Sequence, residues 1–399
     1  MRKLIPIMLL LLLITPSLRA QRKELSQARS YIKSGKDLDK AVALMKDLLA
    51  KDSTNRSNPK VYLTWFQAVE KKYAAGNESL YLKQKYDTAA LFDNVKEMFV
   101  VLETLDSVMA SDKDKAGQLS KIRRKSGETL HAYRPNLYFG GSYFVRKANY
   151  AKAYEFFDTY LRCDTLPLFA PYDFRHSDKH MTEAAYWASF SGFKLQQPQK
   201  TLAYAELAES DTAKLQYLLR YKAEAYHSLK DEAHYVEALR RGFGRYPAHS
   251  YFFAKLMDYY TGTNQLDEAL ALADEALKKD GDSPLFLFAK STVLLNLGRN
   301  EECVELTQRL IKIDATSPEP YYNAGTALLN EVLTLEKNPR ENKEAIRALY
   351  QRALPFMEKY RVLAPKQTDR WAPALYRIYL NLNMGKQFDD IDQIINKAS

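Results

Sequence analysis

The chain of 399 residues has 46% apolar residues and only 14 glycines, which excludes a disordered or collagen-like polymer. Its formal net charge is +10, with both signs interleaved and no basic-aromatic binding motif, so a dedicated nucleic-acid-binding surface is not expected. The composition instead favours a helical protein.

The N-terminus has the pattern of a secretory signal peptide over residues 1–20. Arg2 and Lys3 precede an apolar run over residues 4–14 that is too short to span a bilayer, and Ala20 stands before the predicted cleavage at Gln21. An uncleaved N-terminal anchor is the alternative. No cysteine follows the run, so we do not expect a lipid anchor; cleavage would lower the net charge to +7.

Residues 21–130 predict a first helical hairpin, broken at Gly35, and then an enlarged, irregular hairpin that caps the remaining chain. Pro59 opens this second hairpin. Asn77 and Glu78 are predicted to lead into a long helix over residues 80–109, and charged residues 112–125 to separate it from the following unit.

Residues 131–399 predict an array of helical hairpins with a period of 34 residues. Small residues recur at the eighth and twentieth places, where they allow two helices to approach closely, and bulky residues fill the space between hairpins. The eighth place is the looser of the two, since Met257 occupies it in the unit that begins at Ser250. Two insertions, near 166–181 and 330–349, interrupt the period. The units begin at Thr182, Gln216, Ser250, Pro284 and Pro318, with outlying units at Arg134 and Thr368.

The period and its small and bulky places resemble the tetratricopeptide (TPR) repeat. Together with the signal peptide, the segments ALPFMEKYRVLAP and RWAPALYRIYLNLNMG resemble exported TPR proteins of Gram-negative bacteria. The resemblance implies an all-α fold, a right-handed α–α superhelix. It also implies a scaffold in the periplasm or at the outer membrane that binds a protein or peptide, and it supplies no catalytic residue.

First-helix places that line the concave surface in this family carry mainly aromatic residues here. Aromatic rings with a polar tip suit a binding face, and Arg220 among them could hold a carboxylate bidentately. Packing beneath the insertions explains the same residues equally well, so both interpretations remain open. The predicted face comprises Tyr138, Tyr186, Tyr217, Arg220, Tyr251, Phe288 and Tyr322.

His176 and His180 are the one pair with metal-like spacing, four residues apart, and Asp173 and Asp178 lie nearby. A zinc site usually needs a third protein ligand, and neither an HExxH motif nor a cysteine pair supplies one. A polar insertion loop is therefore preferred, and we expect no metal or cofactor.

No nucleophile elbow, phosphate-binding loop or dinucleotide-binding motif occurs, so we expect a non-enzymatic protein. Two other functions stay open. One is glycan or peptidoglycan binding through the aromatic face, and the other is a metal-dependent enzyme centred on His176. Cys163 and Cys303 belong to distant repeats, and no disulfide between them is expected.

Overall fold

The computed structural model describes residues 21–51, 53–112 and 116–398, and none of these residues lies in a β-strand. The predicted signal peptide lies outside the described residues. By its internal contacts the chain divides after Tyr235 into two compact units, unit 1 up to Tyr235 and unit 2 from Val236. The division expected at residue 130 falls inside a single helix, Ala116–Arg146.

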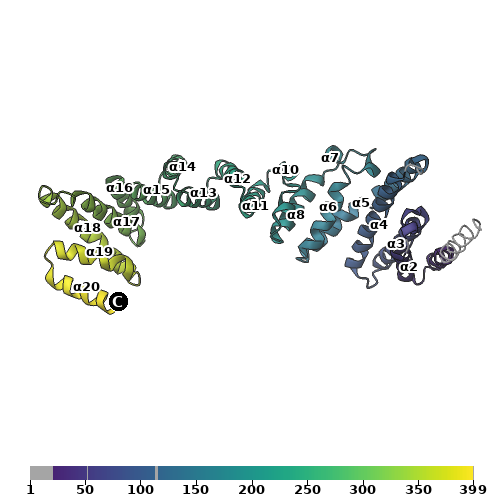
Figure 1. Ribbon diagram of the computed structural model, residues 1–399, viewed down its shortest axis with the longest axis horizontal. Helices are drawn as coiled ribbons and strands as arrows, with labels where there is room; N and C mark the ends of the chain where they lie inside the picture. The colour runs from purple at the N-terminus through teal and green to yellow at the C-terminus, as the bar shows by residue number, and fades with distance from the viewer. Residues whose placement is uncertain (1–20, 52, 113–115, 399) are drawn as a thin grey trace, which may run out of the picture. The chain divides into compact units, whose positions relative to one another are not determined.

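Unit 1 is built of helices that pack mostly against their neighbours in the sequence (Figure 1). The last residues of unit 1 belong to α12 (Glu232–Arg245), which crosses the division between the units. The elements before it are a helix over residues 21–34, α2 (Leu38–Lys51), η1 (Ser53–Ser57), α3 (Pro59–Tyr81), α4 (Thr88–Ser111), α5 (Ala116–Arg146), α6 (Tyr150–Arg162), η3 (Pro167–Phe169), α7 (Phe174–Ser177), α8 (Met181–Lys194), α9 (Pro198–Leu202), α10 (Ala205–Ala208) and α11 (Leu215–Ser228).

The second hairpin differs from its predicted form at both ends. Helix α3 continues through Gly76 to Tyr81, because a glycine there admits the ring of Tyr86: a β-carbon on Gly76 would lie 2.5 Å from that ring. The helix break falls at Lys83, whose φ is +56°, so the prediction of a continuous helix over 80–109 is wrong. Residues 116–125, predicted as a separator, form the first turns of α5.

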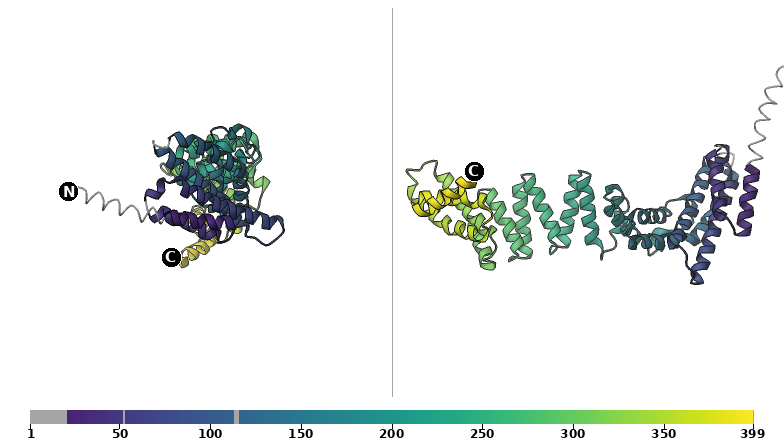
Figure 2. Two further views of the ribbon diagram at one scale, coloured as in Figure 1. Left: turned by 90° about the vertical axis from the view of Figure 1, so that its right-hand side faces the viewer. Right: turned by 90° about the horizontal axis from the view of Figure 1, so that it is seen from below.

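Unit 2 contains the most regular part of the chain. Helices α13 to α16 run side by side in Figure 2, right, where they are drawn in green, and each contacts the next. Helices α13, α15 and α17 begin within one residue of the predicted unit starts. The elements are α13 (Ser250–Gly262), α14 (Leu266–Lys279), α15 (Pro284–Asn296), α16 (Asn300–Ile313), α17 (Glu319–Leu335), α18 (Lys343–Leu363), α19 (Thr368–Asn381) and α20 (Gly385–Ala398).

The turn between the two helices of a repeat is also periodic. Gln196, Lys230, Asn264 and Gly298 are 34 residues apart, and each has a left-handed backbone with φ between +56° and +71°. The next residue donates its N–H to a carbonyl five positions earlier, as Arg299 does to Leu294 at 2.9 Å. This is the Schellman closure of a helix C-terminus, and it fixes the same reversal in these four repeats.

The predicted small residues lie where neighbouring helices touch. Ser189, Ala223, Ala269 and Cys303 have no exposed surface, as expected for the eighth and twentieth places. A β-carbon on Gly141 would lie 2.7 Å from the Phe157 ring, so the Gly140–Gly141 pair serves close packing. These contacts confirm the predicted all-α solenoid.

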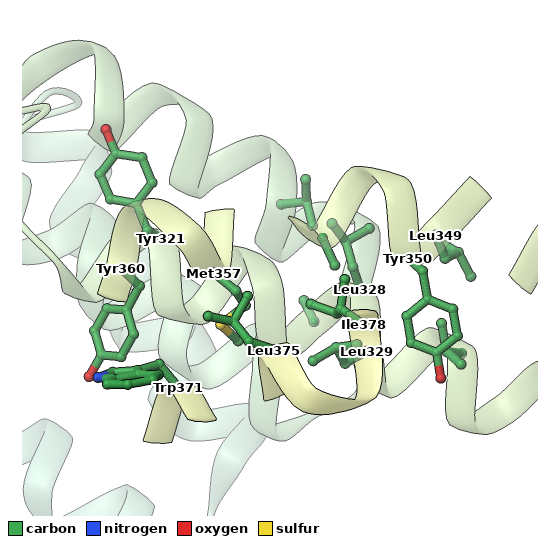
Figure 3. Close-up of a cluster of buried hydrophobic side chains, with 14 of the residues drawn as sticks. Tyr321, Leu328, Leu329, Leu349, Tyr350, Met357, Tyr360, Trp371, Leu375 and Ile378 are labelled. Atoms are coloured by element: carbon green, nitrogen blue, oxygen red, sulfur yellow. The ribbon is translucent and has the colours of Figure 1, made fainter. Parts of the chain in front are cut away.

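The C-terminal core joins α17, α18 and α19. Figure 3 shows Leu328, Met357 and Leu375 among the side chains between these helices, and each is at most 1% exposed. Met357 occupies the space left by Gly325, whose added β-carbon would lie 2.8 Å from the Met357 Cγ. Helices α17 and α18 are 17 and 21 residues long, against 13 or 14 for α13 to α16.

Candidate functional site

The predicted binding-face residues of unit 1 divide into a buried and an exposed pair. Tyr138 is 9% exposed and Tyr186 is 6% exposed, whereas Tyr217 is 52% exposed and Arg220 is exposed on the same helix, α11. Tyr138 and Tyr186 are joined through Glu183 and Lys214. Tyr138 donates its hydroxyl to Glu183 at 2.7 Å, Lys214 lies 3.6 Å from Glu183, and the Lys214 ammonium lies 5.5 Å from the Tyr186 ring centre.

The predicted residues of unit 2 are all half-buried. Tyr251 packs edge-on against Phe252, with ring centres 5.4 Å apart, and Phe288 packs on the C-terminal core. The Tyr322 ring lies 3.7 Å from the Arg370 guanidinium, which also holds Glu319 through two hydrogen bonds. Part of the surface of each of these three rings is therefore used in packing, and the role of the three residues in binding stays a prediction.

A cleft of about 600 Å³ lies in unit 1 between α5 and the insertion near residues 166–181. Helix α7 of the insertion lies beside α5 (Figure 1). We call this the aromatic cleft, because rings from both elements line it. Of the predicted binding-face residues, only Tyr138 lines the cleft. Phe139 is the most exposed of the large apolar residues in the lining, at 52% exposure. Its lining includes His131, Arg134, Tyr138, Phe139, Tyr172 and Asp173.

Arg134 anchors the insertion to α5. The residue is 4% exposed, and its guanidinium lies between the rings of Tyr160 and Phe174, 3.8 and 3.7 Å from their centres. One Nη donates to Asp178 at 2.5 Å, and the other donates to the Tyr160 carbonyl at 3.2 Å. The carboxylate, the carbonyl and the two ring faces offset the cost of burying this cation, although its Nε has no hydrogen-bond partner among the described residues.

Asp178 holds several parts of the insertion together. It also accepts a hydrogen bond from the Tyr160 hydroxyl and one at 2.9 Å from the His180 N–H. Burial acts to raise the pKa of Asp178, but the bonds from Tyr160 and Arg134 outweigh it, and the pKa ends below its usual value. Asp178 therefore stays ionised at neutral pH.

Stacked rings form the wall of the cleft. The imidazole of His131 lies on Tyr172, with ring centres 4.0 Å apart and planes 9° apart, and Tyr172 stacks on Phe174 at 5.6 Å. Burial and the nearby Arg134 lower the pKa of His131, which keeps the imidazole neutral at physiological pH. Burial and the bond to Glu183 raise the pKa of Tyr138 to about 12, so its hydroxyl remains a donor.

The two histidines considered as metal ligands have separate partners. His176 is exposed and its Nδ1 lies 2.8 Å from Asp173, whereas the His180 ring packs on Tyr138 at 4.5 Å. Within the described residues no group of three His, Cys, Asp or Glu side chains could hold a metal ion.

Both cysteines are buried and free, and burial raises the pKa of each thiol to about 12.

In the described part of the chain, no helix is both long and apolar enough to cross a membrane.

Sequence reasoning missed most of the aromatic cleft. Phe139, Tyr172 and His131 occupy no repeat place with an assigned role, and in the repeat pattern Arg134 is only the first residue of a unit. The available signal was the composition of the insertion, where the stretch LFAPYDF carries three aromatic residues in a segment predicted to be a polar loop.

The sequence matches no family model and no curated protein sequence. Two of the similar solved structures are named as TPR proteins. The C-terminal part of a TPR repeat-containing protein from Cytophaga hutchinsonii is 10% identical, with 64% of this chain and 92% of that chain covered and a TM-score of 0.44. Yeast Tom70 is 12% identical, with 96% and 91% covered and a TM-score of 0.34. The TPR domain of P58(IPK) is 11% identical, with 95% and 99% covered and a TM-score of 0.26. The fold assignment rests on the helix packing within each unit.

Proposed function

We propose that this chain is a TPR-class scaffold without catalytic activity that binds a protein or peptide partner. The period of 34 residues, its small-residue contacts and its periodic left-handed turns support the class. Stacked helical hairpins present extended surfaces, and such surfaces recognise polypeptides more readily than small molecules.

The aromatic cleft is the observation that carries the proposal. Its walls are rings already fixed by stacking and by the Arg134–Asp178 pair, so little ordering is needed when a partner binds. Phe139 supplies a large exposed ring at the cleft, and aromatic anchors in preformed pockets dominate the energetics of protein interfaces.

The remaining predicted face residues are proposed as additional contacts within each unit. Tyr217 and Arg220 are exposed on α11 of unit 1, and Tyr251, Phe288 and Tyr322 keep part of their surface in unit 2. Substituting Tyr217, which is 52% exposed, with alanine should weaken the complex and leave the melting temperature nearly unchanged.

We further propose that the protein is exported and works in the envelope, in the periplasm or at the outer membrane. The basic pair and short apolar run at the N-terminus support export. Analysis of the mature N-terminus should place it at or near Gln21. A protein recovered from the cytoplasm with Met1 and the apolar run intact would contradict export.

The test of the function is affinity capture from the envelope of the producing cell, followed by mass spectrometry of wild type and two variants. Phe139→Ala should lose the partner polypeptide. Tyr81→Ala, which removes an aromatic side chain of 86% exposure elsewhere in unit 1, should retain it. Equal recovery by all three proteins would refute the cleft as the binding site, and a protease-resistant glycan in place of a polypeptide would support the glycan alternative.

A further inference from the structure

The aromatic cleft has an unbalanced negative charge. Its lining has one arginine, Arg134, and two carboxylates, Asp173 and Asp178. Arg134 is paired with Asp178, so the charge of Asp173 is not offset within the lining. The Nδ1 of His176 lies 2.8 Å from Asp173, but His176 itself is not part of the lining.

The chain itself shows which group fits between rings and a carboxylate in this region. The guanidinium of Arg134 lies between Tyr160 and Phe174 and is held by Asp178. The more exposed part of the lining has the same composition. Phe139 supplies an exposed ring, and Asp173, with a side chain 66% exposed, supplies the carboxylate. Tyr172 completes the wall, with one face of its ring stacked on His131. No cation lies over either ring among the contacts of the described residues.

We propose that the aromatic cleft accepts a basic side chain, arginine or lysine, from an extended segment of the partner. This inference rests on the proposed function and names the chemistry that its partner presents. Aromatic faces attract cations through the ring quadrupole, and a carboxylate beside them adds a charge-assisted hydrogen bond. His131, neutral at physiological pH, adds no repulsion.

An acidic ligand is disfavoured by the same geometry. The one cation of the lining, Arg134, already donates to Asp178 and to the Tyr160 carbonyl, and Asp173 would repel an incoming carboxylate. A partner segment with glutamate at this point would therefore bind more weakly than one with an uncharged side chain.

The test uses three pools of synthetic nonapeptides that are random at eight positions. The central residue is arginine in the first pool, norleucine in the second and glutamate in the third. Retention of each pool on the immobilised protein is measured for wild type, Asp173→Asn, Phe139→Ala and Asp39→Asn. Asparagine also caps a helix N-terminus, so Asp173→Asn should keep α7 in place. Asp39, whose side chain is 87% exposed in unit 1 and absent from the cleft lining, is the matched control.

Wild type and Asp39→Asn should retain the arginine pool about tenfold better than the glutamate pool. Asp173→Asn should reduce that ratio towards one, and Phe139→Ala should reduce retention of the arginine and norleucine pools. The basic-side-chain proposal is refuted, while peptide binding stands, if wild type retains all three pools equally. It is also refuted if the Asp173→Asn variant keeps the wild-type preference for the arginine pool over the glutamate pool. If no pool is retained above a blank support, both proposals fail.

Discussion

Replacing Arg134 by methionine should show that the insertion near residues 166–181 is held to α5 by a buried ion pair. Methionine fills much of the same volume but removes the charge. Asp178, whose side chain is 14% exposed, would then lose its ionic partner and keep only the bonds from Tyr160 and the His180 N–H. Breaking one side of a buried pair costs about 3 to 5 kcal/mol. We expect about 3 kcal/mol, because these two donors remain.

The double variant Arg134→Met/Asp178→Asn separates the ion pair from general packing. Removing both charges leaves no unpaired buried ion, so the double variant should recover at least about 1 kcal/mol of the loss. Urea unfolding followed by circular dichroism gives the free energies, and hydrogen exchange of the insertion amides shows whether the loss is local. A loss below about 1 kcal/mol for Arg134→Met, or a double variant at least as unstable as the sum of the single ones, would refute this account.

Four further predictions concern packing, turns and titration. Gly127→Ala would place a β-carbon 2.0 Å from the Leu168 carbonyl oxygen and should destabilise unit 1 by about 1 to 3 kcal/mol in urea unfolding, whereas Gly117→Ala on the same helix, with nothing within 4 Å, should be neutral or stabilising. Positions 148 and 298 both have left-handed φ values, +53° and +71°, which glycine adopts more easily than alanine. Ala148→Gly should therefore stabilise the protein by about 1 kcal/mol, and Gly298→Ala should destabilise it by a similar amount. Melting temperatures that move the other way would contradict the assigned turns. The pKa of Asp178 is below its usual value in the folded protein. The ionised Asp178 carboxylate therefore stabilises the fold fully above the ordinary aspartate pKa, and this stabilisation is lost as the pH falls through the lowered value. The urea midpoint of wild type should fall more between pH 5 and pH 3 than that of Asp178→Asn. Cys163 and Cys303, whose pKa values are raised to about 12, should resist iodoacetamide in the native protein and both react after denaturation without reductant, as intact mass will show.

The sequence was most informative where the repeat period is regular. From Thr182 to Leu329 a single period predicted the first helices to within a few residues, because small residues such as Ala269 and Cys303 are required wherever two helices touch. The turn signal was also present: Asn264, Gly298 and Asn383 are residues that tolerate a left-handed backbone. Lys230 and Gln196 occupy equivalent turns without that preference, so the periodicity of the turns is evident only from the structure.

Prediction failed where tertiary packing overrides a local signal. Gly76 and Asn77 are typical helix breakers, but the helix continues through them because the ring of Tyr86 fills the space beside Gly76. The polar stretch around His176 predicted a solvated loop, yet Leu168, Phe169 and Phe174 within the same insertion are at most 3% exposed. A buried arginine gives no distinctive sequence signal, and the aromatic cleft arranged around Arg134 could not be predicted from the period.

The most direct test of partner binding at the aromatic cleft is site-specific photo-crosslinking in the producing cell. Phe139 is replaced by p-benzoylphenylalanine, and a second protein carries the same substitution at Tyr81, which is exposed elsewhere in unit 1. On irradiation, the variant at position 139 should form a discrete, protease-sensitive adduct with a polypeptide, and the yield of that adduct should fall when Asp173→Asn is added. An adduct at position 81 with none at position 139 would contradict the account.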